Sequence, residues 1–122
     1  MSIILHIIPL AQWEAARSIG LHAPETLQTE GFIHFSTPQQ VLGVANKVFP
    51  GQTGLVLLVV DTDRLTSRLK WEAPVHLVNV EMPPTDDRFP HLYGPLNLDA
   101  VVRVVDFPPR ENGLFDLPEG IL

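Results

Sequence analysis

Three histidines of this chain occur in segments where apolar side chains alone would satisfy the fold. His6 interrupts the aliphatic run 3–8, His34 lies in the segment GFIHFSTP, and His91 lies in FPHLYGP. Imidazole titrates near neutral pH, so it is the usual group for orienting hydroxyls or moving protons. We therefore predict that the three rings gather around one polar site, with His34 and His91 as candidate catalytic residues and His6 as a ligand-binding residue.

Two hydroxyl residues, Ser36 and Thr37, follow His34 where a strand is expected to give way to a helix. The two-residue period of a strand places His34 and Ser36 on one face and Phe35 on the other. The unpaired amides of the first helical turn would make a partly positive pocket, suited to an anion or a ribose hydroxyl. We predict that Ser36 and Thr37 bind ligand; alternatively, Thr37 only caps the helix and Ser36 only satisfies a backbone group.

A second polar cluster is predicted around His91. In an extended segment His91 and Tyr93 share a face, and Gly94 with Pro95 then makes a turn that lets a ligand approach the backbone closely. A flat aromatic ring beside an imidazole suits a ring or a sugar, so Tyr93 and Gly94 are predicted ligand-binding residues. The alternative is a tyrosine and a histidine that simply hydrogen-bond within an edge strand.

A carboxylate, Glu72, follows Trp71 at the end of a predicted strand. It is a candidate catalytic acid or base, or an acceptor for a sugar hydroxyl, although isolated carboxylates are usually solvated. Glu30 precedes the His34 segment and could line the same cleft. His22 and His76 lie in loop or edge contexts and are expected to be bystanders.

Composition narrows the classes of function. The 122 residues are 45% hydrophobic, enough for the core of one domain spanning 1–122. A net charge of −6 with only eight Lys and Arg opposes nucleic-acid binding, and the absence of cysteine excludes thiol catalysis and zinc–cysteine sites. No apolar run approaches the roughly 20 residues that span a bilayer, and no secretory signal is evident at the amino terminus, so a cytoplasmic protein without a membrane segment is expected.

The pattern of apolar residues predicts short elements of both kinds. The fold class is therefore α+β, with a mixed, split β-sheet and two short helices. Residues 21–30 are expected to be irregular and 82–88 to form a loop. Strands are predicted over 2–8, 32–36, 54–61, 69–72, 75–80 and 100–107, and helices over 10–19 and 38–49.

The chain resembles the bacterial family known as domain of unknown function 952. The residues that carry the resemblance are 6–7, 13–16, 30–37, 40–41, 71–72, 89–96 and 99–101. That family is distantly similar to the ADP-ribosyltransferase superfamily, including the RNA 2′-phosphotransferases, which places His-x-Ser at the end of a strand before a helix. The resemblance implies an ADP-ribosyltransferase-like fold and NAD as ligand or substrate. It further implies that His6 contacts a ribose, that His34 and Ser36 contact the nicotinamide ribose, and that Tyr93 stacks. The superfamily's glutamate has no match in these motifs, and Glu72 is assigned to it on its place in the chain and its chemistry.

The resulting hypothesis is that this small domain binds a nucleotide-like ligand in a cleft lined by histidines. NAD is the first candidate for that ligand. Its catalytic form cleaves the nicotinamide–ribose bond through an oxocarbenium-like transition state stabilised by an acidic group, without a metal. One alternative is a non-catalytic small-molecule sensor that uses the same cleft. A second is a metal-dependent hydrolase with His6, His34 and His91 as ligands. A third is an interaction module whose histidines are only structural.

Overall fold

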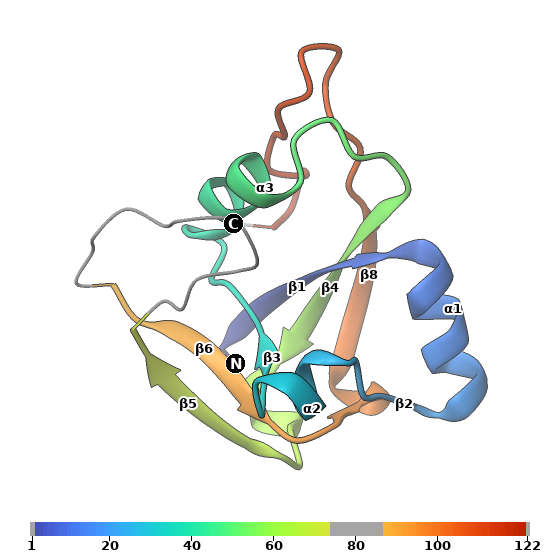
Figure 1. The fold of residues 1–122 in the computed structure, drawn as a ribbon, viewed down its shortest axis with the longest axis vertical. Coiled ribbons are helices and arrows are strands. Elements are labelled where there is room, and N and C mark those ends of the chain that lie inside the picture. The colour runs from blue at the N-terminus through green and yellow to red at the C-terminus, as the bar shows by residue number, and fades with distance from the viewer. Residues whose placement is uncertain (1, 74–86, 122) are drawn as a thin grey trace.

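The computed structural model describes residues 2–73 and 87–121 (Figure 1). The predicted strand 75–80 and His76 lie outside the described residues, as does most of the predicted loop 82–88. No helix in the described part of the chain is long and apolar enough to cross a membrane. The elements, in chain order, are β1 (Ile3–Pro9), α1 (Leu10–Ile19), β2 (Leu21–His22), α2 (Thr26–Thr29), β3 (Ile33–His34), α3 (Val41–Val48), β4 (Leu55–Asp61), β5 (Arg68–Glu72), β6 (Phe89–Tyr93), β7 (Leu96–Asn97) and β8 (Val101–Asp106), with 3₁₀ turns at Thr62–Arg64 and Leu98–Ala100.

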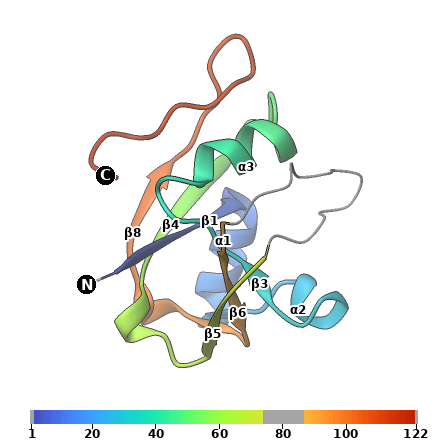
Figure 2. The same cartoon turned by 90° about the vertical axis from the view of Figure 1, so that its left-hand side faces the viewer.

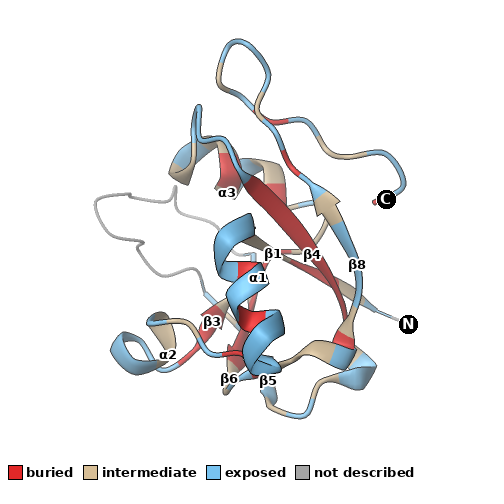
Figure 3. Cartoon of the chain, turned by 90° about the vertical axis from the view of Figure 1, so that its right-hand side faces the viewer, coloured by how far each residue is buried: buried red, intermediate tan, exposed pale blue. Residues whose placement is uncertain are grey.

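The first sheet has the order β1-β4-β8, with β4 in the centre. Every residue of β4 is buried, which Figure 3 shows as a continuous red strand. Val56, Leu58 and Val60 pack into one hydrophobic cluster, whereas Leu55 and Leu57 pack into another on the opposite face. A strand covered on both faces needs apolar residues throughout, which explains why β4 shows no alternation of apolar and polar residues.

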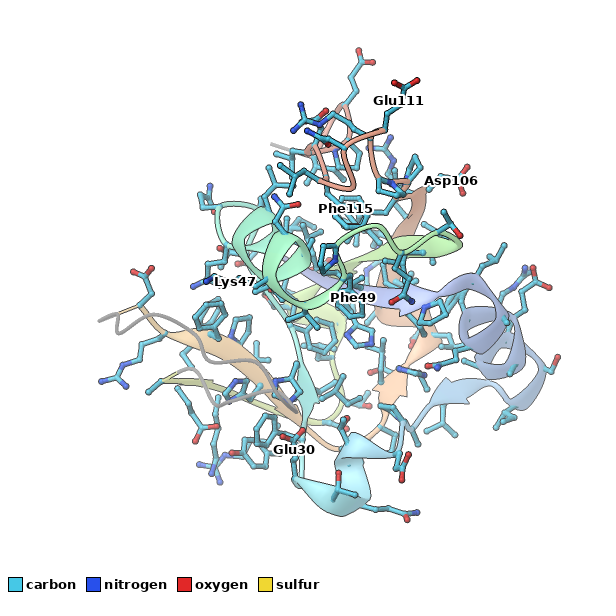
Figure 4. All side chains as sticks on the ribbon, turned by 45° about the horizontal axis from the view of Figure 1, so that its top comes forward. Glu30, Lys47, Phe49, Asp106, Glu111 and Phe115 are labelled. Carbon is cyan, nitrogen blue, oxygen red and sulfur yellow. The ribbon has the colours of Figure 1, made fainter. Side chains whose placement is uncertain are left out.

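Two layers cover this sheet. On one face lies α3 (Figure 2), which packs through Val41 and Ala45. The stacked rings of Phe107 and Phe115, 4.7 Å apart, belong to the same cluster, and Phe115 is labelled in Figure 4. On the other face α1 packs through Trp13 beside the second sheet. The helices therefore protect opposite faces of β1-β4-β8, as expected for an α+β domain.

The second sheet has the order β3-β6-β5, and a separate two-stranded ladder joins β2 to β7. The α+β class and the split sheet are thus confirmed. Every strand pairing among the described residues is antiparallel. Residues 21–30, expected to be irregular, hold β2 and α2. Two-residue and four-residue elements are too short to give a periodic pattern, so the sequence did not predict them.

One short segment ties the two sheets together. The Phe35 amide donates to the Pro90 carbonyl of β6 at 3.0 Å, whereas Ser36 exchanges two backbone hydrogen bonds with Leu5 of β1, at 2.7 and 2.8 Å. The predicted strand 32–36 therefore ends as a sheet strand at His34 and crosses from one sheet to the other. This crossing brings β1, β3 and β6 together.

The helix predicted over 38–49 is observed as α3, which begins later, at Val41. Thr37 caps this segment in a capping box: the Gln40 amide donates to Thr37 Oγ1 at 3.2 Å, and the Thr37 amide donates to Gln40 Oε1 at 3.0 Å. At α1 the prediction is confirmed in full, and Gly20 ends that helix with a φ of 98° while its amide donates to the Ala16 carbonyl.

Candidate functional site

A cavity of about 320 Å³ lies where the two sheets meet. Its walls include four histidines from four different strands: His6 of β1, His22 of β2, His34 of β3 and His91 of β6. Most of the remaining wall is aliphatic or aromatic. The three histidines predicted to gather are therefore close together in space, and a fourth joins them.

His6 has a fixed orientation. Its Nδ1 lies 2.8 Å from the backbone carbonyl oxygen of His34. Because a carbonyl oxygen only accepts, Nδ1 carries the hydrogen and Nε2 keeps a lone pair. Burial, helped by the nearby His22 ring, lowers the pKa of His6 to about 3, so this imidazole is neutral at physiological pH.

His34 is oriented by a carboxylate. Its Nε2 lies 2.7 Å from Oε2 of Glu30, which is labelled in Figure 4 and sits between α2 and β3. The carboxylate accepts, so Nε2 carries a hydrogen. The sequence placed Glu30 near this cleft only by its position in the chain. In the structure its role is to hold the His34 ring.

His91 is oriented by a second carboxylate. Its Nδ1 lies 3.0 Å from Oε1 of Glu72, and the Tyr93 hydroxyl donates to the same oxygen at 2.6 Å. The hydrogen bonds from Tyr93 and then His91 lower the pKa of Glu72, while burial lowers the pKa of His91 against the opposing effect of Glu72. The pair is therefore an ionised carboxylate with a neutral imidazole, whose Nδ1 bears the hydrogen and whose Nε2 bears the lone pair.

Glu72 and Tyr93 lie behind His91 and do not line the cavity formed by the described residues. The Tyr93 ring is 5.3 Å from Phe32 and has Lys70 Nζ 4.6 Å from its centroid. Phe32 and Lys70 therefore occupy part of the surroundings of this ring, and its stacking on a ligand stays a prediction. Glu72 is placed where it orients His91, and its predicted catalytic role stays a prediction.

Two further predicted ligand-binding residues have structural roles. A Cβ atom added to Gly94, whose φ is 153°, would lie 2.5 Å from Ser67 Oγ. Ser67 therefore makes a close approach to Gly94, and ligand binding at Gly94 stays a prediction. Thr37 forms the capping box and is not part of the cavity wall, whereas Ser36 is in the wall.

The sequence missed two wall residues that contact His6. The His22 ring centroid lies 5.3 Å from that of His6, and the Phe35 centroid lies 5.1 Å from it. Phe35 was expected on the face opposite to His34, but both line the cavity because the chain changes sheets at this point. His22 was expected to be a bystander, and its two-residue strand carries no pattern that would have revealed it.

The possible metal ligands among the described residues are their His, Asp and Glu side chains. Across 2–73 and 87–121, no three His, Asp or Glu side chains are arranged to hold a metal ion. One ring nitrogen of each of His6, His34 and His91 is already directed at an oxygen of this chain. The other ring nitrogen of each histidine is the one that could accept a hydrogen bond from a ligand.

Comparison with known proteins identifies the family. Residues 7–104 match the family described as a protein of unknown function, DUF952. The chain belongs to this family. Crystal structures of protein CC0527 from Caulobacter crescentus resemble this DUF952 domain closely: the unmodified protein has 36% identity and a TM-score of 0.80, and a double mutant has 35% and 0.79, each with 95% of both chains covered.

The solution NMR structure of CC0527 agrees, with 36% identity, a TM-score of 0.74, and coverage of 93% of this chain and 91% of that chain. No curated protein matches the DUF952 domain significantly. The family resemblance inferred from the motifs is thus confirmed. These matches show the family and the fold of the chain.

Proposed function

We propose that the four-histidine cavity binds a nucleotide-like ligand, with NAD as the first candidate. One observation carries the proposal: three imidazoles from β1, β3 and β6 line one cavity, and each is oriented by an oxygen atom of this chain. In its neutral form each ring then has an acceptor nitrogen available. Ribose hydroxyls are donors that such nitrogens can orient.

The walls suit the ring systems of a nucleoside. Phe35, Phe49 and Phe89 line the cavity together with aliphatic side chains. Phe49, at the end of α3, is labelled in Figure 4. Apolar walls with a few polar groups are typical of small-molecule sites, and about 320 Å³ lies at the lower end of their roughly 300–1,000 Å³ range. The cavity therefore fits one nucleoside portion of NAD rather than the whole dinucleotide.

The charge of the walls sets which part of the ligand enters. None of the described residues that line the cavity is Lys, Arg, Asp or Glu. Phosphates would meet no counter-charge from these residues, and the chain carries a net charge of −6. In this proposal the base and ribose occupy the cavity while the phosphates remain toward solvent.

The catalytic form of the proposal adds one step. The bond between C1′ of the ribose and the nicotinamide nitrogen breaks, and its electron pair leaves with nicotinamide. A water or acceptor hydroxyl attacks C1′ and transfers its proton to a neutral imidazole. His91 suits this role because Glu72 holds its hydrogen on Nδ1 and would stabilise the imidazolium. The ADP-ribosyltransferase resemblance of the His34 and Ser36 motif supports NAD as the first substrate to test.

Calorimetric titration with NAD, nicotinamide riboside and adenosine tests the binding step. We expect at least one of them to bind, and His34→Ala to weaken that binding about tenfold, the effect of losing roughly 1.4 kcal/mol of interaction. Lys47→Ala, on the exposed side of α3, is the matched control and should bind normally. Absence of binding to all three ligands would exclude the proposal.

Chromatographic analysis of the titrated samples distinguishes enzyme from sensor. Release of nicotinamide from NAD by the wild-type protein, lost in His91→Ala, supports the catalytic form. Binding without release supports a non-catalytic sensor. If His34→Ala destabilises the fold by as much free energy as it removes from ligand binding, the histidines are structural and the chain is an interaction module.

A further inference from the structure

One polar atom in the cavity wall has no partner. His22 is 5% exposed, and its Nε2 is buried without a hydrogen bond to any described residue. Buried polar side-chain atoms in folded proteins nearly always have a partner. The other three histidines of the cavity each have one, so His22 is the exception within its own cluster.

The His22 ring is held by packing. Its described ring contact is with His6, at 5.3 Å between centroids and an angle of 49° between planes. Its strand β2 is only two residues long and pairs with the equally short β7. Since no hydrogen bond to a described residue fixes the imidazole, it can turn in its place without breaking a polar contact.

His22 also stands between two hollows. It lines the histidine cavity, and it lines a shallower groove bounded by α1, β2 and α2. Gln12, Pro24 and Thr26 are shared by both hollows as well. A turn of the ring within this shared wall would present the buried nitrogen to a molecule in the cavity.

We infer that His22 is a ligand-recognition residue that supplies a hydrogen bond to the polar edge of an uncharged planar heterocycle. Three features select that class. The described wall bears no formal charge while its histidines are neutral, and Phe35 packs against the adjacent His6. The polar side-chain atom that is buried without a partner among the described residues is an imidazole nitrogen. Burial lowers the pKa of His22, which keeps its ring neutral and able to either donate or accept. A nucleobase edge or a pyridine carboxamide has this chemistry.

This inference rests on the proposed function, and its test separates the two. The probes are nicotinamide, adenine and adenosine, titrated calorimetrically into wild type, His22→Phe and His22→Gln. Phe keeps an aromatic ring but removes both nitrogens, whereas Gln restores a polar edge. Leu21→Thr, at the exposed neighbouring position of β2, is the matched control.

We expect His22→Phe to lose at least about tenfold in affinity and to have an unchanged or higher melting temperature, because it removes a buried unpaired nitrogen. His22→Gln should recover part of the affinity, and Leu21→Thr should bind as wild type does. In the ¹⁵N spectrum of the wild type, the His22 Nε2 resonance should shift when the probe is added.

Two results would overturn the inference while leaving the proposed function intact. One is binding by His22→Phe within about threefold of wild type, and the other is an unmoved His22 Nε2 resonance on saturation. If His22→Phe fails to fold, the shift of the wild-type His22 Nε2 resonance and the affinity of His22→Gln still test the inference. If the wild type binds none of the probes, the inference and the proposed nucleoside binding fall together.

Discussion

The Glu72 carboxylate lies behind His91, with Oε1 3.0 Å from His91 Nδ1 and 2.6 Å from the Tyr93 hydroxyl. One carboxylate oxygen thus accepts from two donors, and it determines which nitrogen of His91 bears the hydrogen. This places a neutral base in the cavity wall. Glu72 therefore acts through His91 and is a positioning residue.

Removal of the Glu72 carboxylate should change the tautomer of His91 while the imidazole itself stays in the cavity wall. Glu72→Ala is expected to leave His91 as a mixture of tautomers and to weaken nucleoside binding several-fold. Glu72→Gln keeps an acceptor oxygen for both donors, so it should retain the wild-type tautomer. The ¹⁵N resonances of the His91 ring measure this directly. The same single tautomer in wild type and Glu72→Ala would contradict the role.

The buried histidines should make the protein less stable in mild acid. The pKa of His6 is about 3 in the folded chain and near 6.5 when unfolded, so between these values the unfolded state binds more protons. Stability is therefore full above about pH 6.5 and falls as the pH decreases. From pH 7 to pH 5, His6 alone contributes a loss of about 2 kcal/mol at most.

Urea unfolding at the two pH values measures this loss. His6→Leu should unfold with a smaller difference between pH 7 and pH 5 than wild type. His22 and His91, whose pKa values are also lowered by burial, shift stability in the same direction and account for the residual slope. If the unfolding free energy of wild type and of His6→Leu falls equally between pH 7 and pH 5, the His6 ring does not control stability in acid.

Thr37 should contribute to the stability of the fold and not to ligand affinity. Thr37→Ala removes the acceptor for the Gln40 amide and is expected to cost about 1 kcal/mol of unfolding free energy. Ligand affinity should stay at the wild-type value, because Thr37 is not in the described cavity wall. Chemical denaturation together with titration tests both parts. A loss of affinity without loss of stability would restore Thr37 as a ligand-binding residue.

Gly94 should tolerate a side chain only if the side chain of Ser67 is removed. Gly94→Ala places a methyl group 2.5 Å from Ser67 Oγ at a φ of 153°, and is expected to destabilise by roughly 1–3 kcal/mol. Adding Ser67→Gly removes the clash and should recover part of that loss. A double-mutant cycle of unfolding free energies measures the coupling. Purely additive effects would show that the contact does not set the need for glycine.

The centre of β4 should be the most sensitive part of the fold. Leu58 is fully buried between the second sheet and α1, so Leu58→Ala is expected to cost about 2–5 kcal/mol. Val104 of β8 is 41% exposed, and Val104→Ala should change stability by less than about 1 kcal/mol. Equal effects of the two substitutions on the urea midpoint would contradict the layered core.

Much of the fold could be predicted because it depends on local patterns. The uninterrupted apolar run of β4, the helical spacing of α1 and the Thr37–Gln40 capping box are encoded within a few neighbouring residues. Such patterns act through side-chain periodicity and backbone hydrogen bonding, which a sequence displays directly. The shortest elements, β2 and α2, exist because of distant partners and gave no such pattern.

The sequence by itself determined that histidines stand where apolar residues would suffice, in the motifs of its family. Tertiary structure alone decided what surrounds each ring. The chain crosses from one sheet to the other at Phe35 and Ser36, which brings His6 and His91 together and turns Phe35 into the same cavity. Hydrogen bonds between residues far apart in the chain then orient those rings, while Nε2 of His22 has no hydrogen-bond partner among the described residues. Periodicity describes a residue's own strand, whereas ring orientation depends on neighbours that only folding supplies.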